Sequence, residues 1–387
     1  MQCPLQNYET PAPEIRVQEL TDWNGSSLIM NVSVLPATLV PIHLERLPER
    51  PKVSVLVSNY NYAEYIAQAI DSVLEQTYPN FELIICDDGS TDNSREVISG
   101  YCLRDPRVFL ITKENGGQAS GFNAALAAST GDLICFFDSD DILRPAKLAC
   151  MVEAHRQAPN AGFGVHRVQR VNRQRRPQGV WPLGSMLPHG WHGGQMLLDG
   201  GVLGYMPPTS GLSLHRSVAE RIFPLPENFK VCADQVIIRF APLLTSIVRS
   251  QEVLVEYRLH GANSYERSKI TAESISREIT MCRDLWIAQC NFLKSLDPAL
   301  VSELQPYENS SYILYLEYLQ ARLAQSPSTS LCHQRFIDDV QAKLNPVKLW
   351  FWKSSIHLPS LIFDRVINLM NRQNLLKEIL ARFRGVA

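Results

Sequence analysis

The fold is decided by residues 53–94, which read VSVLVSNYNYAEYIAQAIDSVLEQTYPNFELIICDDGSTDNS. Residues 53–57 are a short apolar run that predicts a buried strand, and residues 63–76 carry apolar side chains at helical spacing. Residues 83–86 predict a second strand, and residues 92–102 predict a second helix that Asp92 caps. Strands that alternate with helices in this way are typical of a parallel sheet.

The same alternation continues as far as residue 137. Residues 108–111 and 133–137 predict two further strands, and residues 117–129 predict an alanine-rich helix between them. The chain is therefore expected to form an α/β fold with a Rossmann-like, mostly parallel sheet flanked by helices. Sheets of this kind bind ligands at the carboxyl ends of their strands.

A polar cluster follows each of the four predicted strands. The clusters occupy residues 58–61, 87–90, 115–118 and 138–141. Because the carboxyl ends of parallel strands meet at one edge of the sheet, we expect the clusters to form a nucleotide site there. The candidate nucleotide-binding residues are Ser58, Asn59, Tyr60, Asp87, Asp88, Gly117, Gln118, Asp138 and Ser139.

Three carboxylates, Asp138, Asp140 and Asp141, follow the fourth strand. Carboxylates this close repel one another unless a cation or a hydrogen-bond donor lies between them. Mg²⁺ and Mn²⁺ prefer oxygen ligands, and a diphosphate would complete their coordination. We therefore expect Asp138 and Asp140 to be metal ligands. Asp141 has an alternative interpretation, as the cap of a helix expected over residues 145–154.

The other clusters allow both a ligand and a turn. Asp87 or Asp88 could accept the imide N–H of uracil, and Tyr60 could stack on a base, while residues 87–92 also fit a tight turn followed by an N-cap. Residues 115–117 could bring backbone N–H groups near a phosphate, or form a plain turn. The absence of G-x-G-x-x-G and of a P-loop motif from these turns argues against a dinucleotide dehydrogenase and a P-loop NTPase.

Residues 53–94, together with NGGQASGFNAALAASTGDLICFFDSDD at 115–141, resemble the family 2 glycosyltransferases of the GT-A fold. The likeness is continuous from about Val53 to Leu148 and continues more loosely to about residue 268 through PPTSGLSLHR and YRLHGANSY. One departure is Ser58-Asn59, where many members carry Pro-Thr. The resemblance implies a metal-dependent, inverting transferase. In it Asp87 or Asp88 would contact the base, and Asp138 and Asp140 would hold the metal that bridges the diphosphate.

Two residues further along the chain complete the expected site. His260 lies in a segment that resembles the family's late metal- or phosphate-contacting segment, although an isolated histidine can also be structural. Inverting transfer needs a general base, and the candidate is Asp234. Many similar enzymes have Glu-Asp where this chain has Ala233-Asp234, so Asp234 must serve alone. The competing interpretation of Asp234 is the N-cap of a helix from Gln235 onward.

The chain is predicted to have three parts. They are an N-terminal extension (1–50), a GT-A domain (51–262, with a nucleotide-binding half at 51–148 and an acceptor half at 149–262) and a helical C-terminal region (263–387). The segment Pro207–Gly211 is expected to shape the floor of the sugar or acceptor pocket, with a rigid loop as the alternative.

Composition bounds the partners and the compartment. A formal net charge of -2 gives no overall field that would attract nucleic acid. Nine cysteines without a CxxC pair fit a reducing compartment, and neither a signal peptide nor a bilayer-spanning run is evident, so a cytoplasmic protein is expected. Residues 350–352 (Trp-Phe-Trp) and a predicted amphipathic helix at 360–384 allow peripheral contact with the inner face of a membrane. Packing on the body or on a second subunit in a homodimer is the alternative.

These observations favour a glycosyltransferase that uses Mn²⁺ or Mg²⁺ and moves a sugar from a nucleotide diphosphate, UDP above others, to an acceptor hydroxyl. The acceptor could be a glycan, a lipid-linked molecule or a protein. The alternatives are a metal-dependent nucleotidyltransferase and a non-catalytic module that binds nucleotide sugars. A nucleotidyltransferase would usually show a basic, glycine-rich loop early in the chain, whereas residues 58–65 contain neither Lys nor Arg. A binding module would keep Asp138 and Asp140 but would not need Asp234.

Overall fold

The computed structural model describes residues 20–21, 27–28, 39–182, 189–198, 206–261, 270–344 and 346–372. The chain divides into two units, residues 1–37 and residues 38–387. In the first unit the described residues form a short antiparallel pair, β1 (Leu20–Thr21) with β2 (Ser27–Leu28). All other described elements belong to the second unit.

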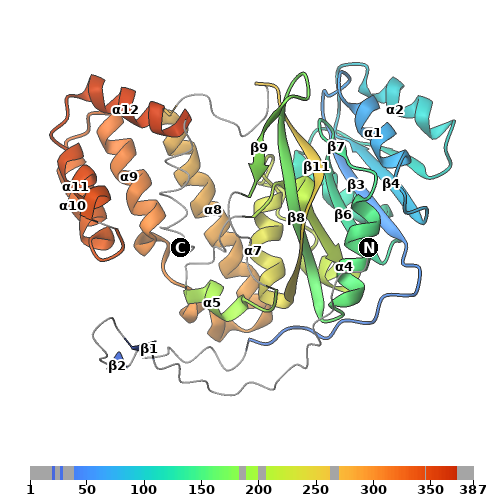
Figure 1. Ribbon diagram of the computed structural model, residues 1–387, viewed down its shortest axis with the longest axis horizontal. Coiled ribbons are helices and arrows are strands. Elements are labelled where there is room, and N and C mark those ends of the chain that lie inside the picture. Colours follow the sequence, from blue (N-terminus) through green and yellow to red (C-terminus); the bar gives the residue numbers. More distant parts are fainter. Residues whose placement is uncertain are drawn as a thin grey trace. The chain divides into compact units, whose positions relative to one another are not determined.

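A mixed sheet is built from strands within residues 53–259 of the second unit (Figure 1). The strands follow the order β5-β4-β3-β6-β10-β8-β11-β7, and β9 pairs with β8. The first four of these strands pair in parallel, β10 runs antiparallel to both of its neighbours, and β8 pairs in parallel with β11. The strands are β3 (Val53–Asn59), β4 (Phe81–Asp87), β5 (Val108–Thr112), β6 (Leu133–Asp138), β7 (Ile142–Leu143), β8 (Ala161–Asn172), β9 (Pro177–Trp181), β10 (Leu212–His215) and β11 (Ser246–Leu259).

Some of the helices of the second unit cover the two faces of this sheet, and others form a separate C-terminal group. The helices are α1 (Ile66–Leu74), α2 (Ser94–Cys102), α3 (Gln118–Ala128), α4 (Lys147–Gln157), α5 (Gly193–Leu198), α6 (Arg216–Ile222), α7 (Asp234–Leu244), α8 (Ala272–Leu296), α9 (Ser311–Leu323), α10 (Thr329–Val340), α11 (Pro346–Ser355) and α12 (Ser360–Arg372). Helices α1, α2 and α4 pack on one face, and α3, α6 and α7 pack on the other.

Alternation along each strand builds these two cores. On β3, Val55 and Val57 point into the core beneath α1, while Leu56 points into the core beneath α3. Successive side chains of a strand leave opposite faces, so one apolar run supplies both layers. The prediction of an α/β fold with helices on both faces is confirmed, and so are the four strands and three helices expected between residues 53 and 138.

Two local expectations differ in detail from the structure. Helix α2 begins at Ser94 and its N-cap position is Asn93, but the carboxylate of Asp92 still accepts the Ser94 N–H at 3.0 Å. The other Asp92 oxygen accepts the Ala63 N–H at 2.9 Å, so this side chain joins α2 to the segment before α1. Residues 161–259, which have no clear periodicity in the sequence, contain the two long strands β8 and β11.

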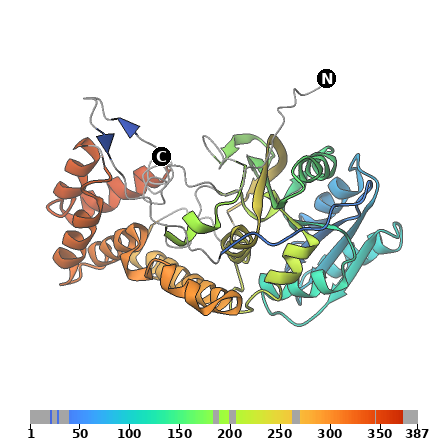
Figure 2. The same ribbon diagram turned by 90° about the horizontal axis from the view of Figure 1, so that it is seen from below.

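The C-terminal helices form a core of their own around Trp352. Helix α8 packs on α7 within the sheet domain and on α9 beyond it (Figure 1), and Figure 2 shows the following helices (orange to red) gathered in one group. Trp352 is fully buried against Tyr315 and Phe336. Phe363 of α12 lies in the same core, so α12 packs on α9 within the C-terminal group of helices.

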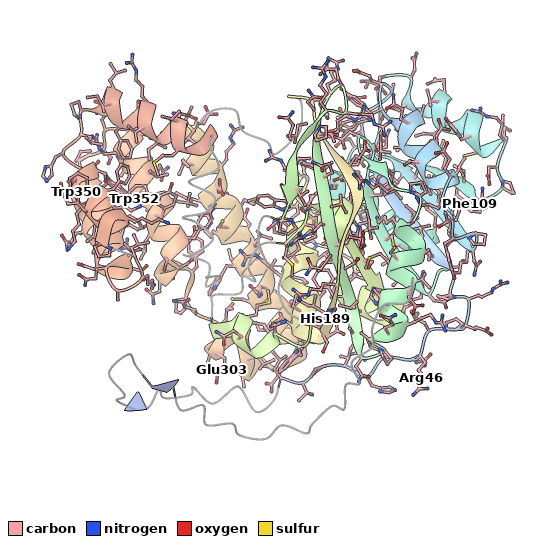
Figure 3. The ribbon with its side chains drawn as sticks, in the orientation of Figure 1. Arg46, Phe109, His189, Glu303, Trp350 and Trp352 are labelled. Atoms are coloured by element: carbon pink, nitrogen blue, oxygen red, sulfur yellow. The ribbon has the colours of Figure 1, made fainter. Side chains whose placement is uncertain are left out.

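The three aromatic residues 350–352 do not share one exposed surface. Trp350 is 69% exposed and lies at the outer edge in Figure 3, whereas Trp352 is labelled among the helices there and Phe351 packs against the core. The predicted helix over 360–384 is observed as Ser360–Arg372, and the remainder lies outside the described residues. In the part of the chain that the structure describes, no helix is both long and apolar enough to cross a bilayer.

His155 on α4 gives a prediction for acid stability. Its ring is buried, with Nδ1 3.0 Å from the Ala161 carbonyl oxygen and Nε2 3.1 Å from the Ser213 hydroxyl, and burial lowers its pKa to about 4. A lowered histidine pKa means that the unfolded chain takes up the proton first. Stability from the neutral ring is therefore complete above pH 6.5 and is lost as the pH falls towards about 4.

We expect His155→Gln to weaken this acid loss. Wild type should lose about 1 kcal/mol more unfolding free energy than the variant between pH 7 and pH 5.5. Urea denaturation of both proteins at each pH measures the difference. Equal losses in the two proteins would show that His155 does not contribute.

Candidate active site

The register of the parallel strands brings the predicted polar clusters to one edge of the sheet. Ser58 of β3 is paired with Asp138 of β6, and Asn59 of β3 is paired with Asp87 of β4. All four residues lie at the carboxyl ends of their strands, where ligand sites of open α/β sheets form. The expected gathering of the clusters is therefore present in the structure.

Asp87 is buried and accepts hydrogen bonds from several protein donors. Its oxygens accept Arg95 Nε at 2.7 Å, Asn59 Nδ2 at 2.9 Å and the Ser90 N–H at 3.1 Å. Burial alone would raise the pKa of this carboxyl, but the donors from Arg95, Ser90 and Asn59 outweigh it and hold the pKa below its usual range. Asp87 thus stays ionised and joins the end of β3, the loop after β4 and helix α2.

Asp88 holds the loop that precedes α3. Its carboxylate accepts the N–H groups of Gly116 at 3.0 Å and Gly117 at 2.6 Å, and Lys113 Nζ at 2.7 Å. The next N–H, of Gln118, donates to the Lys230 carbonyl at 2.9 Å. The N–H groups of Gly116 and Gly117 therefore have a protein acceptor, which favours the turn interpretation of residues 115–117.

The remaining strand-end residues divide into supported and exposed side chains. Ser139 is buried and its hydroxyl donates to the Ser58 carbonyl at 3.3 Å, while the side chain of Ser58 lies against Gly121 of α3. Tyr60 is 44% exposed, so its ring is open to a ligand. Of the clusters on β3 and β4, Tyr60 is the member best placed to stack on a base.

Asp138 and Asp140 stand at the centre of the site. Asp138 Oδ1 accepts Gln118 Nε2 at 3.1 Å. Burial, together with the charges of Asp140 and Asp234, raises the pKa of Asp138 well above its usual range. Asp140 Oδ2 lies 2.8 Å from Nε2 of His260, whose ring stacks on Tyr65 at a centroid distance of 4.8 Å. The structure thus brings His260 to the acidic cluster, and it also gives that ring a packed environment.

Asp141 is not a helix cap. Helix α4 begins at Lys147 with Ala146 at its N-cap position, whereas the Asp141 carboxylate accepts the Ser210 hydroxyl at 2.6 Å and the Arg258 N–H at 2.9 Å. Burial and the charges of Asp140 and Asp138 raise the pKa of Asp141 well above its usual range. Asp141 therefore acts as an internal support that joins the acidic loop to β11.

Lys147 is a site residue that the sequence did not single out, and Ser210 was expected only as a member of the segment Pro207–Gly211. Ser210 lies in the 3₁₀ turn η1 (Thr209–Gly211), and its hydroxyl oxygen also accepts the Asp138 N–H at 3.1 Å. Its carbonyl accepts Nζ of Lys147, which is fully buried, at 3.0 Å. Burial lowers the pKa of Lys147, while the nearby charges of Asp141 and Asp138 oppose that shift. The segment Pro207–Gly211 thus supports the acidic loop, residues 138–141, through the hydrogen bonds of Ser210.

Asp234 lies beside this cluster, at the first residue of α7. It is buried, and Oδ1 accepts the Gln235 N–H at 3.0 Å, while the N-cap position is Ala233. The structure therefore places Asp234 one residue later than the cap interpretation did. Burial raises the pKa of Asp234 to about 6. A carboxyl with this pKa can accept a proton near neutral pH and is well suited to a general base.

The donors at this edge suit a hard divalent cation bound together with a diphosphate. Among the described residues no group of three His, Cys, Asp or Glu side chains forms a ready cage. Burial, and after it the charges of Asp140 and Asp234, raise the pKa of Asp138, and a cation would relieve the repulsion among these carboxylates. Asp138 and Asp140 would supply oxygen ligands, and Mg²⁺ or Mn²⁺ keeps further positions for water and phosphate.

Two arginines between β8 and β9, and the tryptophans Trp181 and Trp191, have partners within the protein. Arg173 pairs with Glu64, and Arg175 pairs with Glu256. The indole N–H of Trp181 donates to the Met206 carbonyl at 3.0 Å, and Trp191 packs against the core. These contacts favour a structural role for both tryptophans.

Comparison with known proteins agrees with this geometry. The family described as Glycosyl transferase family 2 matches residues 54–223. The chain carries a family 2 glycosyltransferase domain. An uncharacterized glycosyltransferase of Nostoc sp. is 39% identical over 216 residues, which are 55% of this chain and 66% of that protein. The chondroitin synthase of Pasteurella multocida is 45% identical over 107 residues, which are 28% of this chain and 11% of that protein.

A solved structure of Staphylococcus aureus TarS (residues 1–349, with UDP) aligns over 84% of this chain and 92% of that one. The identity is 17% and the TM-score is 0.48. The prediction of a family 2 glycosyltransferase domain is confirmed, while the chain spans less than two thirds of the length of the curated relatives it matches. The matched residues of the glycosyltransferase domain end before Asp234 and His260, so the roles of these two residues rest on geometry.

Proposed function

We propose that the protein transfers a sugar from a UDP-sugar to an acceptor hydroxyl, with inversion at the anomeric carbon. The observation that carries this proposal is the pair Asp138 and Asp234. Two carboxyls from distant parts of the chain lie close enough for the charge of one to raise the pKa of the other. Asp138 stands where a nucleotide diphosphate would bind, and Asp234 opens a helix on the other side of Gln118.

The chain's own residues divide the work of the reaction. Tyr60 stacks on the uracil, while Asp87 and Asp88 hold the loops around the base and the ribose. Asp234 takes the proton from the acceptor hydroxyl as its oxygen attacks the anomeric carbon. Mn²⁺ or Mg²⁺ held by Asp138 and Asp140, with His260 beside them, would neutralise charge on the departing diphosphate.

A melting screen tests the donor site. The protein is melted with UDP, GDP or CDP, each with and without Mn²⁺. A ligand at about a hundred times its Kd adds about 2.7 kcal/mol to the unfolding free energy. We expect a clear rise for UDP with Mn²⁺, followed by UDP release from a UDP-sugar. If no nucleotide raises the melting temperature under either condition, the donor-site proposal fails.

We expect Asp140→Asn to lower the apparent affinity for Mn²⁺ by about tenfold or more, since one anionic ligand is lost. Titration of Mn²⁺ against a fixed UDP concentration, followed by calorimetry, measures the change. Asp338→Asn on α10 is the matched control, because Asp338 is exposed and belongs to the C-terminal helices. An unchanged Mn²⁺ affinity in Asp140→Asn would remove Asp140 from the metal site.

A further inference from the structure

The segment that leads into α7, residues 224–233, is held along α3 by hydrogen bonds, and we call it the fastened segment. The two run antiparallel: as the segment proceeds from Phe223 towards α7, its residues contact positions progressively nearer the start of α3. The contacts, at 2.7 to 3.3 Å, join Asn123 with Leu225, Ser120 with Glu227, Ala119 with Phe229, and Gln118 with Lys230. The segment that precedes α7 is thus held against α3 by hydrogen bonds along its length.

Gln118 makes the last contact of this series with its side chain. The carboxamide Nε2 donates to Asp138 Oδ1 at 3.1 Å, and the carboxamide oxygen accepts the Ala233 N–H at 2.9 Å. Ala233 is the N-cap residue of α7, directly before Asp234. One planar group therefore connects the carboxylate on the donor side with the start of the helix that carries the candidate base.

We propose that Gln118 is a positioning residue that fixes the separation between Asp138 and Asp234. This role rests on the proposed transfer reaction, in which one of these carboxyls faces the diphosphate and the other faces the acceptor. It differs from the expectation that Gln118 contacts the nucleotide directly, because both ends of its carboxamide are engaged by the protein.

Physical chemistry explains why a glutamine is needed here. When both are ionised, Asp138 and Asp234 repel each other, so a link that donates to one side and accepts from the other opposes their drift apart. An ionised glutamate at residue 118 could accept from Ala233 but could not donate to Asp138, and a methionine could do neither. Small errors in the placement of a reacting group are costly, with about a hundredfold loss for a displacement of about 1 Å.

The test compares Gln118→Met and Gln118→Glu with Asn123→Ala. Asn123 is the matched control because its carboxamide also makes two hydrogen bonds in the fastened segment, but at the end distant from Asp138. Calorimetry gives the Kd of UDP with Mn²⁺, and UDP release from UDP-N-acetylglucosamine and UDP-glucose, with water as acceptor, gives kcat. Thermal melting follows the stability of each protein.

We expect both Gln118 variants to lose about ten- to a hundredfold in kcat while the Kd of UDP stays within about threefold of wild type. Asn123→Ala should keep a kcat close to wild type even though it melts earlier. If Gln118→Met does not fold, the kcat and Kd of Gln118→Glu still test the proposal.

Three outcomes would overturn the proposal. A weaker Kd with an unchanged kcat would make Gln118 a nucleotide contact. An equal kcat loss in Asn123→Ala would make the fastened segment a general support. An unchanged kcat in both Gln118 variants would leave no positioning role. Failure of the proposed function looks different, because wild type would then release no UDP from either donor.

Discussion

Asp234→Asn is expected to lower kcat by about a thousandfold and to leave the Kd of UDP with Mn²⁺ close to that of wild type. Asparagine keeps the size of the side chain and can still accept the Gln235 N–H, so α7 should begin as it does in wild type. It cannot take a proton from an acceptor hydroxyl. The contrast between lost turnover and retained donor binding is what separates a general base from a donor ligand.

The pH profile adds a second readout for the same residue. Because burial raises the pKa of Asp234 to about 6, the base is ionised above that pH and becomes protonated below it. We expect kcat/KM of wild type to fall as the pH drops below about 6, and the residual rate of Asp234→Asn to lack that dependence. UDP release measured from pH 5 to pH 8 gives both profiles.

Asp338→Asn is again a suitable control, since it removes an exposed carboxylate by the same chemical change. A kcat for Asp234→Asn within about tenfold of wild type would exclude Asp234 as the base. The transferase assignment itself would survive that result, because it rests on the family match and not on this residue.

The fold of residues 53–138 was predictable because its signals are local. Each strand between residues 53 and 138 contains an apolar run, and its polar cluster follows within a few residues in the sequence. The strands β8 and β11 were missed for the opposite reason. Glycines and arginines interrupt the apolar pattern of β8, and its ladder with β11 has register shifts and joins residues as distant as Ala161 and Ser246. Tertiary pairing decides such strands, not intrinsic propensity.

In the site, too, the local sequence indicates some residues, whereas the contacts of these residues depend on tertiary structure. Sequence pattern indicated Asp87, Asp88 and Asp138, since their residue types follow strands, but it could not indicate which donors they accept. The role of Lys147 could not be predicted from the sequence. A lysine in the first turn of a helix usually lies in solvent, and only the packed turn that carries Ser210 makes this one a buried donor beneath the acidic loop.

Gly117→Ala is expected to destabilise the protein by about 3 to 4 kcal/mol, since two unfavourable effects combine at this position. Gly117 has φ 90° and ψ 175°, a region of backbone conformation that is almost confined to glycine. An added Cβ would also lie 2.4 Å from the Cα of Lys230, and a backbone atom cannot swing away as a flexible side chain would. The fastened segment would have to move.

Gly179→Ala on β9 separates the two effects. Gly179 also has a positive φ, of 112°, but a Cβ there would meet nothing within 4 Å, so only the conformational strain of about 1 kcal/mol remains. Urea denaturation of wild type and both variants measures the two losses. The excess in Gly117→Ala is the contribution of close contact between Gly117 and Lys230. Because Lys230 precedes α7 by four residues, the same substitution should also displace Asp234 and lower kcat in the folded protein. If Gly117→Ala is as stable and as active as Gly179→Ala, the fastened segment can move at little energetic cost. In that case α3 does not fix the position of Asp234.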